Sequence, residues 1–144
     1  MTDPTAADRA ELEVMVEAFF RSFTSGEGTA ERLDVLRKLF LPEAVIVRTC
    51  GDEPAVYSVE EFIAPRQELL EGGTLVSFSE WPVNGRIDIF GDIAHWWGSY
   101  AKEGVQNGEA FTGRGMKSMQ FIRTLDGWRI SAAAWDDARP GLRL

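Results

Sequence analysis

Apolar positions in the first forty residues recur at helical spacing. Over residues 12–23 they return every three or four positions, which predicts an amphipathic helix that a Ser-Gly-Glu-Gly run then stops. A second helix is predicted to begin at Thr29 and to end before Pro42. Each helix has one face too apolar to remain in water, so we expect both helices to cover a common apolar surface.

The next stretch changes from strand to helix within thirty residues. Residues 44–48 and 55–57 are short and β-branched, and they predict a small hairpin. Ser58 and Glu61 then have the spacing of a capping box, which opens a helix that Gly72 and Gly73 end. Pro65 falls inside this helix, so we expect a kink there or a split into two helices.

From Thr74 onward the apolar positions alternate, which predicts strands. Residues 84–137 are interpreted as four long strands of an antiparallel sheet, separated by turn signals at Gly91-Asp92, at 105–108 and at Asp126-Gly127. The sequence therefore predicts an α+β fold in which about three N-terminal helices cover one face of a sheet.

Two-residue loops at Gly91-Asp92 and Asp126-Gly127 would fix which side chains share a face. The more apolar face, expected to meet the helices, receives the following residues: Ile87, Ile89, Ala94, Trp96, Gly98, Tyr100, Met119, Phe121, Arg123, Leu125, Trp128, Ile130, Ala132, Ala134 and, by continued alternation, Asp136. The outward face receives Asp88, His95, Trp97 and Trp135. In this register Lys117 lies opposite Asp136, as an ion pair across the strands.

The length, net charge and apolar content of the chain exclude several classes of binding partner. The 144 residues fit one domain, and the formal net charge of -8 opposes binding to nucleic acid or to anionic membranes. No run reaches the roughly eighteen apolar residues of a membrane span, and the acidic N-terminus does not resemble a secretory signal. We therefore expect a cytoplasmic protein.

The chemistry-bearing residues are few. Cys50 and His95 are the single cysteine and the single histidine, so no disulfide within the chain and no zinc site are predicted. Cys50 fits a small buried residue at a strand end better than a nucleophile. No metal and no cofactor is expected.

The order helix, helix, short hairpin, helix and long antiparallel strands resembles the NTF2-like superfamily, in particular its SnoaL-like and DUF4440-like bacterial members. The resemblance covers nearly the whole chain, residues 1–144, and is carried by AFFRSF, FGDIAHWWGSY and FIRTLDGWRI. It implies a cone: a strongly curved, mostly antiparallel sheet wrapped around three helices, with an apolar cavity on the concave side. It also implies an outer sheet face that is often used for dimerisation.

Asp88 opposite His95 is the most enzyme-like pair, because a carboxylate that orients an imidazole makes a general base. Their outward face equally fits a surface or interface role. On the concave face the polar candidates are Tyr100, Arg123 and Asp136, although Lys117 opposite Asp136 also fits a structural ion pair. Arg48 and Tyr57 are placed near the cavity mouth.

Aromatic residues are abundant enough to line a pocket or to fill a core. The predicted pocket consists of Phe19, Phe23, Tyr57, Phe62, Trp96, Tyr100, Phe121 and Ala134. Trp97 and Trp135, both placed outward, favour a homodimer through the outer sheet face.

Two classes of function stay open at this point. One is a cofactor-independent acid–base enzyme of the isomerase, dehydratase or cyclase type, acting on a small hydrophobic molecule. The other is a module that binds a ligand or associates as a dimer without catalysis.

Overall fold

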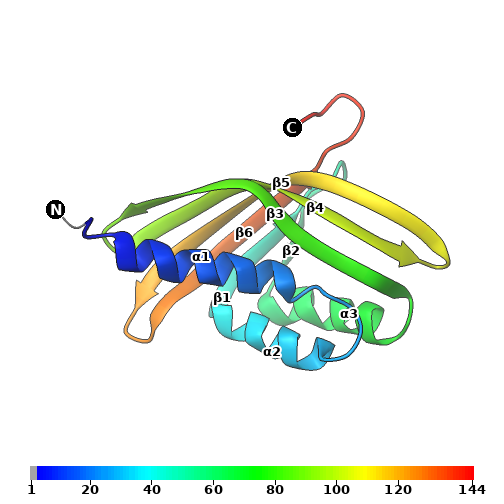
Figure 1. The fold of residues 1–144 in the computed structure, drawn as a ribbon, viewed down its shortest axis with the longest axis horizontal. Helices are drawn as coiled ribbons and strands as arrows, with labels where there is room; N and C mark the ends of the chain where they lie inside the picture. The colour runs from blue at the N-terminus through cyan, green and yellow to red at the C-terminus, as the bar shows by residue number, and fades with distance from the viewer. Residues whose placement is uncertain (1–2) are drawn as a thin grey trace.

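The computed structural model describes residues 3–144 and places three helices on one side of a curved sheet (Figure 1). The helices are α1 (Ala6–Arg21), α2 (Thr29–Leu39) and α3 (Val59–Glu71). The strands are β1 (Phe40–Arg48), β2 (Ala55–Tyr57), β3 (Leu75–Phe90), β4 (Ile93–Gln106), β5 (Glu109–Thr124) and β6 (Gly127–Asp137). The α+β class and the curved, helix-covered sheet predicted from the sequence are confirmed.

The six strands form one mixed sheet in the order β2-β1-β6-β5-β4-β3. Strands β3 to β6 are joined by hairpins, and only β1 and β6 run parallel. We call the face toward the helices the concave face and the opposite one the outer face. Among residues 3–144, no helix is long and apolar enough to cross a membrane.

The core lies between α1 and the concave face. Phe19 and Phe20 of α1 are fully buried, and Phe20 packs edge-on against Trp96 at 5.6 Å between ring centres. The Trp96 indole lies over Gly85 and Gly98, where an added Cβ would come within 2.4 Å of the ring at either position. These two glycines bring β3 and β4 close enough to the helix for the ring to fit.

Helix α3 begins as the sequence predicts and continues past its proline. The Ser58 hydroxyl accepts from the Glu61 amide, and the Glu61 carboxylate accepts from the Ser58 amide, which completes the capping box. Pro65 does not split the helix, which runs unbroken to Glu71.

The two predicted hairpin loops have different outcomes. Phe90 pairs with Ile93 and Asp88 with His95, so the loop at Gly91-Asp92 is confirmed. At the second hairpin Thr124 pairs with Gly127, so the loop is Leu125-Asp126 and not Asp126-Gly127. The predicted cross-strand partners of β5 and β6 were therefore wrong.

A β-bulge in β6 then reverses the faces of its second half. Phe121 pairs with Ile130 but Gln120 pairs with Ala132, so Ser131 is the extra residue. Beyond the bulge every side chain lies on the face opposite to the predicted one. Trp135 and Asp137 lie on the concave face, whereas Ala134 and Asp136 lie on the outer face.

Candidate functional site

An inner cavity of about 450 Å³ lies between α3, the C-terminal end of α1 and the concave face. This volume is in the range of small-molecule sites. Its apolar lining comes from Phe23, Tyr57, Phe62, Pro65, Leu69, Leu70, Leu75, Phe78, Phe111 and Trp135, and its polar lining from Arg48, Arg66, Glu80, Lys102, Gln106 and Lys117.

The charge of the inner cavity is opposite to that of the whole protein. Four cationic side chains line it and one carboxylate, Glu80, opposes them, although the chain carries a formal net charge of -8. Three of the cations have acidic partners: Arg48 with Asp52, Lys102 with Asp137, and Lys117 with Glu80. The cavity therefore offers a local excess of positive charge.

Arg66 of α3 is the cation that accounts for most of this excess. Its guanidinium lies over the Phe62 ring at 3.9 Å and within 6 Å of the Tyr57 and Trp135 ring centres. One guanidinium nitrogen donates to the Phe62 carbonyl, and no carboxylate of residues 3–144 lies within 4 Å. Burial lowers the pKa of Arg66 to about 10, so the side chain remains a cation at neutral pH.

Lys117 of β5 brings an amine to the wall of the cavity beneath α1. Its side chain is 4% exposed, and its Nζ lies 3.8 Å from Glu80 Oε1. Burial lowers the pKa of Lys117, because the charged form loses its water, and Glu80 only partly restores it. The strand register predicted from the sequence placed this lysine opposite Asp136, and that prediction was wrong: Lys117 lies opposite Trp135.

Tyr100, Asp137 and Lys102 form a cluster beside the cavity. The buried Tyr100 hydroxyl donates to the Asp137 carboxylate, and Lys102 Nζ lies 3.1 Å from the same group. Burial alone would raise the pKa of Asp137, but the Tyr100 hydrogen bond and the Lys102 charge bring it below its ordinary value. Burial and the bond to Asp137 raise the pKa of Tyr100, which stays protonated as a donor.

Cys50 follows β1 in a left-handed turn with φ of 47°. Burial and the charge of nearby Asp137 raise the pKa of its thiol. A raised pKa keeps the thiol protonated at neutral pH, which agrees with a structural role and not with a nucleophile.

The predicted pocket residues divide into three groups. Phe23, Tyr57 and Phe62 line the inner cavity. Phe19, Trp96, Tyr100 and Phe121 are buried in the core beside it. Ala134 lies on the outer face because of the bulge in β6, so its predicted place was wrong. Which of these residues contacts a ligand stays a prediction.

Two of the predicted polar candidates are far from the inner cavity or turned away from it. Arg123 holds both carboxylate oxygens of Asp8 at 2.7 Å and Asp92 at 2.9 Å, so it fastens the first turn of α1 to the sheet, whereas the cavity lies at the opposite end of α1. Asp136 lies on the outer side and pairs with Arg139, which lowers the pKa of its carboxyl. A buried base at Asp136 is therefore ruled out.

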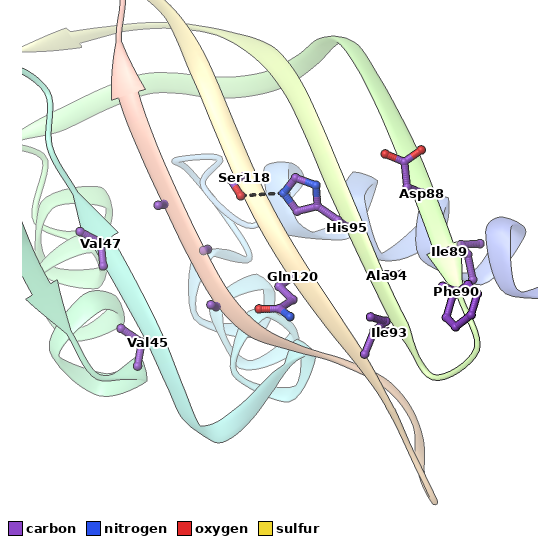
Figure 2. Close-up of a pocket in the computed structure, with 13 residues that line it drawn as sticks. Val45, Val47, Asp88, Ile89, Phe90, Ile93, Ala94, His95, Ser118 and Gln120 are labelled. Atoms are coloured by element: carbon purple, nitrogen blue, oxygen red, sulfur yellow. Dashed lines mark hydrogen bonds between the residues drawn. The ribbon is translucent and has the colours of Figure 1, made fainter.

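Asp88 and His95 lie on the outer face, as predicted, at a second depression (Figure 2). This outer hollow has a volume of about 550 Å³ and is lined mostly by apolar side chains of β1, β3, β4 and β6. Figure 2 shows the His95 ring turned toward Ser118, whose hydroxyl lies 2.8 Å from Nε2, while Asp88 pairs with Arg86. The carboxylate–imidazole pair expected from the strand register is not formed.

Several cavity residues were absent from the sequence prediction. Arg66 was overlooked because a polar residue in a helix ordinarily faces water, and Glu80 because its part of β3 was not assigned a face. Lys102 of β4 was overlooked because the face assignment of that strand stopped at Tyr100. Asp137 was missed because an extra residue in β6 leaves no mark in an alternating pattern. Two signals for a charged cavity were available in the sequence: Lys117, a charge amid the apolar positions of a central strand, and Lys102, two residues after Tyr100 and thus on the same strand face.

Comparison with known proteins shows similarity at the level of structure. Neither family models nor curated protein sequences match the chain. The Kfla4162 protein from Kribbella flavida matches with a TM-score of 0.76 at 17% identity, over 92% of both chains. An NTF2-like superfamily protein from Salmonella enterica serovar Typhimurium matches with a TM-score of 0.75 at 16% identity, again over 92% of both chains.

A hexachlorocyclohexane dehydrochlorinase, LinA type 2, matches with a TM-score of 0.74 at 12% identity, over 92% of this chain and 86% of its own. The SnoaL-like subtype stays a prediction. The arrangement of helices, curved sheet and inner cavity, together with these matches, shows that the chain has the NTF2-like fold.

Proposed function

We propose that the inner cavity binds a small organic acid whose body is aromatic or otherwise apolar. The sequence predicts a small hydrophobic ligand, and the aromatic lining of the cavity agrees with that part. Because cationic side chains outnumber carboxylates in the lining, we expect the ligand to carry a negatively charged group as well. A cytoplasmic location stays the expectation from the sequence.

The single observation that carries the proposal is Arg66. Arg66 is largely removed from water and has no carboxylate partner within residues 3–144, which is costly, and a bound anion would offset that cost. The guanidinium is held flat against Phe62, and its planar fork suits a carboxylate better than an ammonium would. An aromatic acid would place its ring among the aromatic side chains and its carboxylate against Arg66.

Isothermal titration calorimetry with phenylacetate and phenylacetamide tests this proposal, because the two ligands differ only in the charged group. We expect the acid to bind about ten-fold more tightly than the amide or better, since a hydrogen bond to a charged group is worth about 1.5–3 kcal/mol. Arg66→Gln should remove the difference, and Arg86→Gln on the outer face should keep it. Equal affinities for acid and amide in the unmodified protein would refute the proposal.

Acid–base catalysis without a cofactor is a second candidate for the same cavity. Glu80 and Lys117 are the observation in its favour, because a carboxylate and an amine 3.8 Å apart at an apolar wall are able to exchange a proton with a ligand. A dehydrochlorinase is among the proteins of similar structure. The base-catalysed opening of 5-nitrobenzisoxazole is a suitable probe: Glu80→Gln should slow it about a hundredfold. A rate unchanged in Glu80→Gln would exclude Glu80 as the base.

We also propose that the outer face pairs with a second copy of the chain. Phe90 and Trp97 of this face are 82% and 47% exposed, and Val45 and Ile93 are exposed beside them. Two such faces related by a two-fold axis would cover one another's apolar side chains. Trp135 was expected to belong to this interface, but it lies on the concave face and contributes nothing to it.

A further inference from the structure

The three lysines of the chain occupy three different environments. Lys38 is exposed on α2. Lys102 lines the inner cavity, but its ammonium lies 3.1 Å from the Asp137 carboxylate. Lys117 lines the same cavity from the centre of the sheet, and five aromatic ring centres lie within 6 Å of its Nζ.

The Lys117 amine has the surroundings of a nucleophilic lysine. Its side chain is nine-tenths or more buried, and no residue within 3–144 accepts a hydrogen bond from it, since Glu80 Oε1 is 3.8 Å away. An ammonium in such a place is poorly solvated, so the neutral amine gains population, and each unit by which the pKa falls raises the neutral fraction about tenfold. A neutral amine at the wall of a cavity is able to attack a carbonyl carbon.

We propose that Lys117 forms an imine with an aldehyde or ketone group of a ligand held in the inner cavity. The inference deepens the proposed function and rests on it for the rest of the ligand, namely an aromatic body with its anionic group at Arg66. Arg66 Cζ and Lys117 Nζ lie 5.5 Å and 5.3 Å from the centre of the same Trp135 ring. Both groups therefore flank the Trp135 ring, and a ligand packed against that ring would have Arg66 and Lys117 as neighbours.

The reaction balances with the groups present. The lone pair of Lys117 Nζ attacks the carbonyl carbon, and the oxygen takes up a proton to give a carbinolamine. Glu80 is the nearest carboxylate to accept a proton from the nitrogen and return it to the departing hydroxyl. The C–O bond breaks, water leaves with both amine protons, and a C=N bond remains. No oxidant, reductant or metal enters the step.

Lys102 lines the same cavity and serves as an internal control for the reactivity of Lys117. It shares access to the ligand, but its ammonium is stabilised by Asp137, which in turn is held by Tyr100. This close ion pair holds the Lys102 nitrogen against Asp137 and leaves it less free to approach a ligand's carbonyl carbon. Faster reaction at Lys117 than at Lys102 would therefore show that the Lys117 amine is itself more reactive, because the aldehyde has access to both lysines once it is in the cavity.

Reductive trapping tests the inference on the intact protein. The protein is incubated at neutral pH with 4-carboxybenzaldehyde and sodium cyanoborohydride, and the modified lysines are identified by peptide mass spectrometry. We expect Lys117 to be modified about ten-fold faster than Lys38 and Lys102, and phenylacetate to slow the modification by competition. Lys117→Met should lose the fast phase, and Lys38→Arg should retain it.

The outcomes separate this inference from the proposed function. If phenylacetate binds by calorimetry but Lys117 reacts no faster than Lys38, the imine is excluded and the acid site stands. If phenylacetate does not bind but uncharged benzaldehyde modifies Lys117 selectively, the amine is reactive as proposed, and the acid site is wrong. Equal modification of all three lysines by both aldehydes would overturn the inference.

Discussion

At the scale of single residues, the inner cavity is defined by charges placed where apolar side chains are the rule. Arg66, Lys117 and Asp137 are each removed from much of the solvent, and each is accommodated differently: by aromatic faces, by a distant carboxylate, and by a tyrosine with a lysine. Removing a charge from water costs free energy unless partners offset that cost, and charged groups perturbed in this way cluster at functional sites. Their concentration at one cavity is the reason to assign it as the site.

Asp137 gives a prediction on pH dependence. Its pKa is lower in the folded chain than in the unfolded one, so its contribution to stability is complete above the unfolded value, about 3.9, and is lost as the pH falls through the folded value. Asp137→Asn should lower the free energy of unfolding by roughly 1–2 kcal/mol at neutral pH. In urea titrations from pH 7 down to about pH 3, the difference in free energy of unfolding between the unmodified protein and Asp137→Asn should become smaller as the pH falls.

The matched control is Asp126→Asn, at a turn carboxylate that makes no ion pair within residues 3–144. It should track the unmodified protein across the same range. If the loss of unfolding free energy in Asp137→Asn stayed constant with pH, the Tyr100–Asp137–Lys102 cluster would not be ionised as described.

At the scale of elements, the sequence predicts which segments are helix and strand but not every face. The alternating pattern predicted the cross-strand partners of the β3–β4 hairpin correctly, because Gly-Asp is a residue pair typical of a two-residue hairpin loop. It failed in β6, where the turn is shifted by one residue and Ser131 is an extra residue in the strand. A one-residue irregularity exchanges the two faces, so Trp135 could be placed in the cavity, and Asp137 beside it, only from the structure.

The glycines beneath Trp96 give a prediction at this scale. A Cβ at Gly98 would come within 2.4 Å of the indole and 2.7 Å of the β3 backbone, neither of which is able to move away freely. Gly98→Ala should therefore lower the free energy of unfolding by about 1–3 kcal/mol, measured by urea denaturation.

Gly113→Ala is the control for this effect. Gly113 lies on β5, and the atoms nearest to its added Cβ would belong to the flexible Lys102 side chain of β4, with Cε at 2.7 Å. We expect a smaller loss there, since a lysine side chain has other rotamers to adopt. A loss at Gly113 equal to that at Gly98 would argue that glycine itself, and not the Trp96 contact, matters in these strands.

At the scale of the whole molecule, the two faces of the sheet have separate roles in this account. We propose that the inner cavity of the concave face holds the ligand, and that the outer face, with the hollow that Figure 2 shows, meets a second copy. The sequence indicated this division through the NTF2-like resemblance, and the fold is confirmed. It did not indicate that the cavity is cationic, because Arg66, Lys102 and Lys117 come from three elements that only the fold brings together.

Phe90→Glu tests the dimer. A charge at the most exposed aromatic of the outer face should be incompatible with burial against a second copy, so sedimentation at low micromolar protein should change from dimer to monomer. Val14→Glu makes the same chemical change at an exposed valine of α1 and should leave the dimer intact. An unmodified protein that sediments as a monomer would contradict the proposal directly.

The most direct measurement for the central claim is a crystal structure of the protein with a bound aromatic acid such as phenylacetate. We expect ligand density in the inner cavity, with the carboxylate against the Arg66 guanidinium and the ring among Phe62, Trp135 and their aromatic neighbours. Density in the outer hollow beside His95, or a ligand in the inner cavity whose carboxylate points away from Arg66, would contradict it.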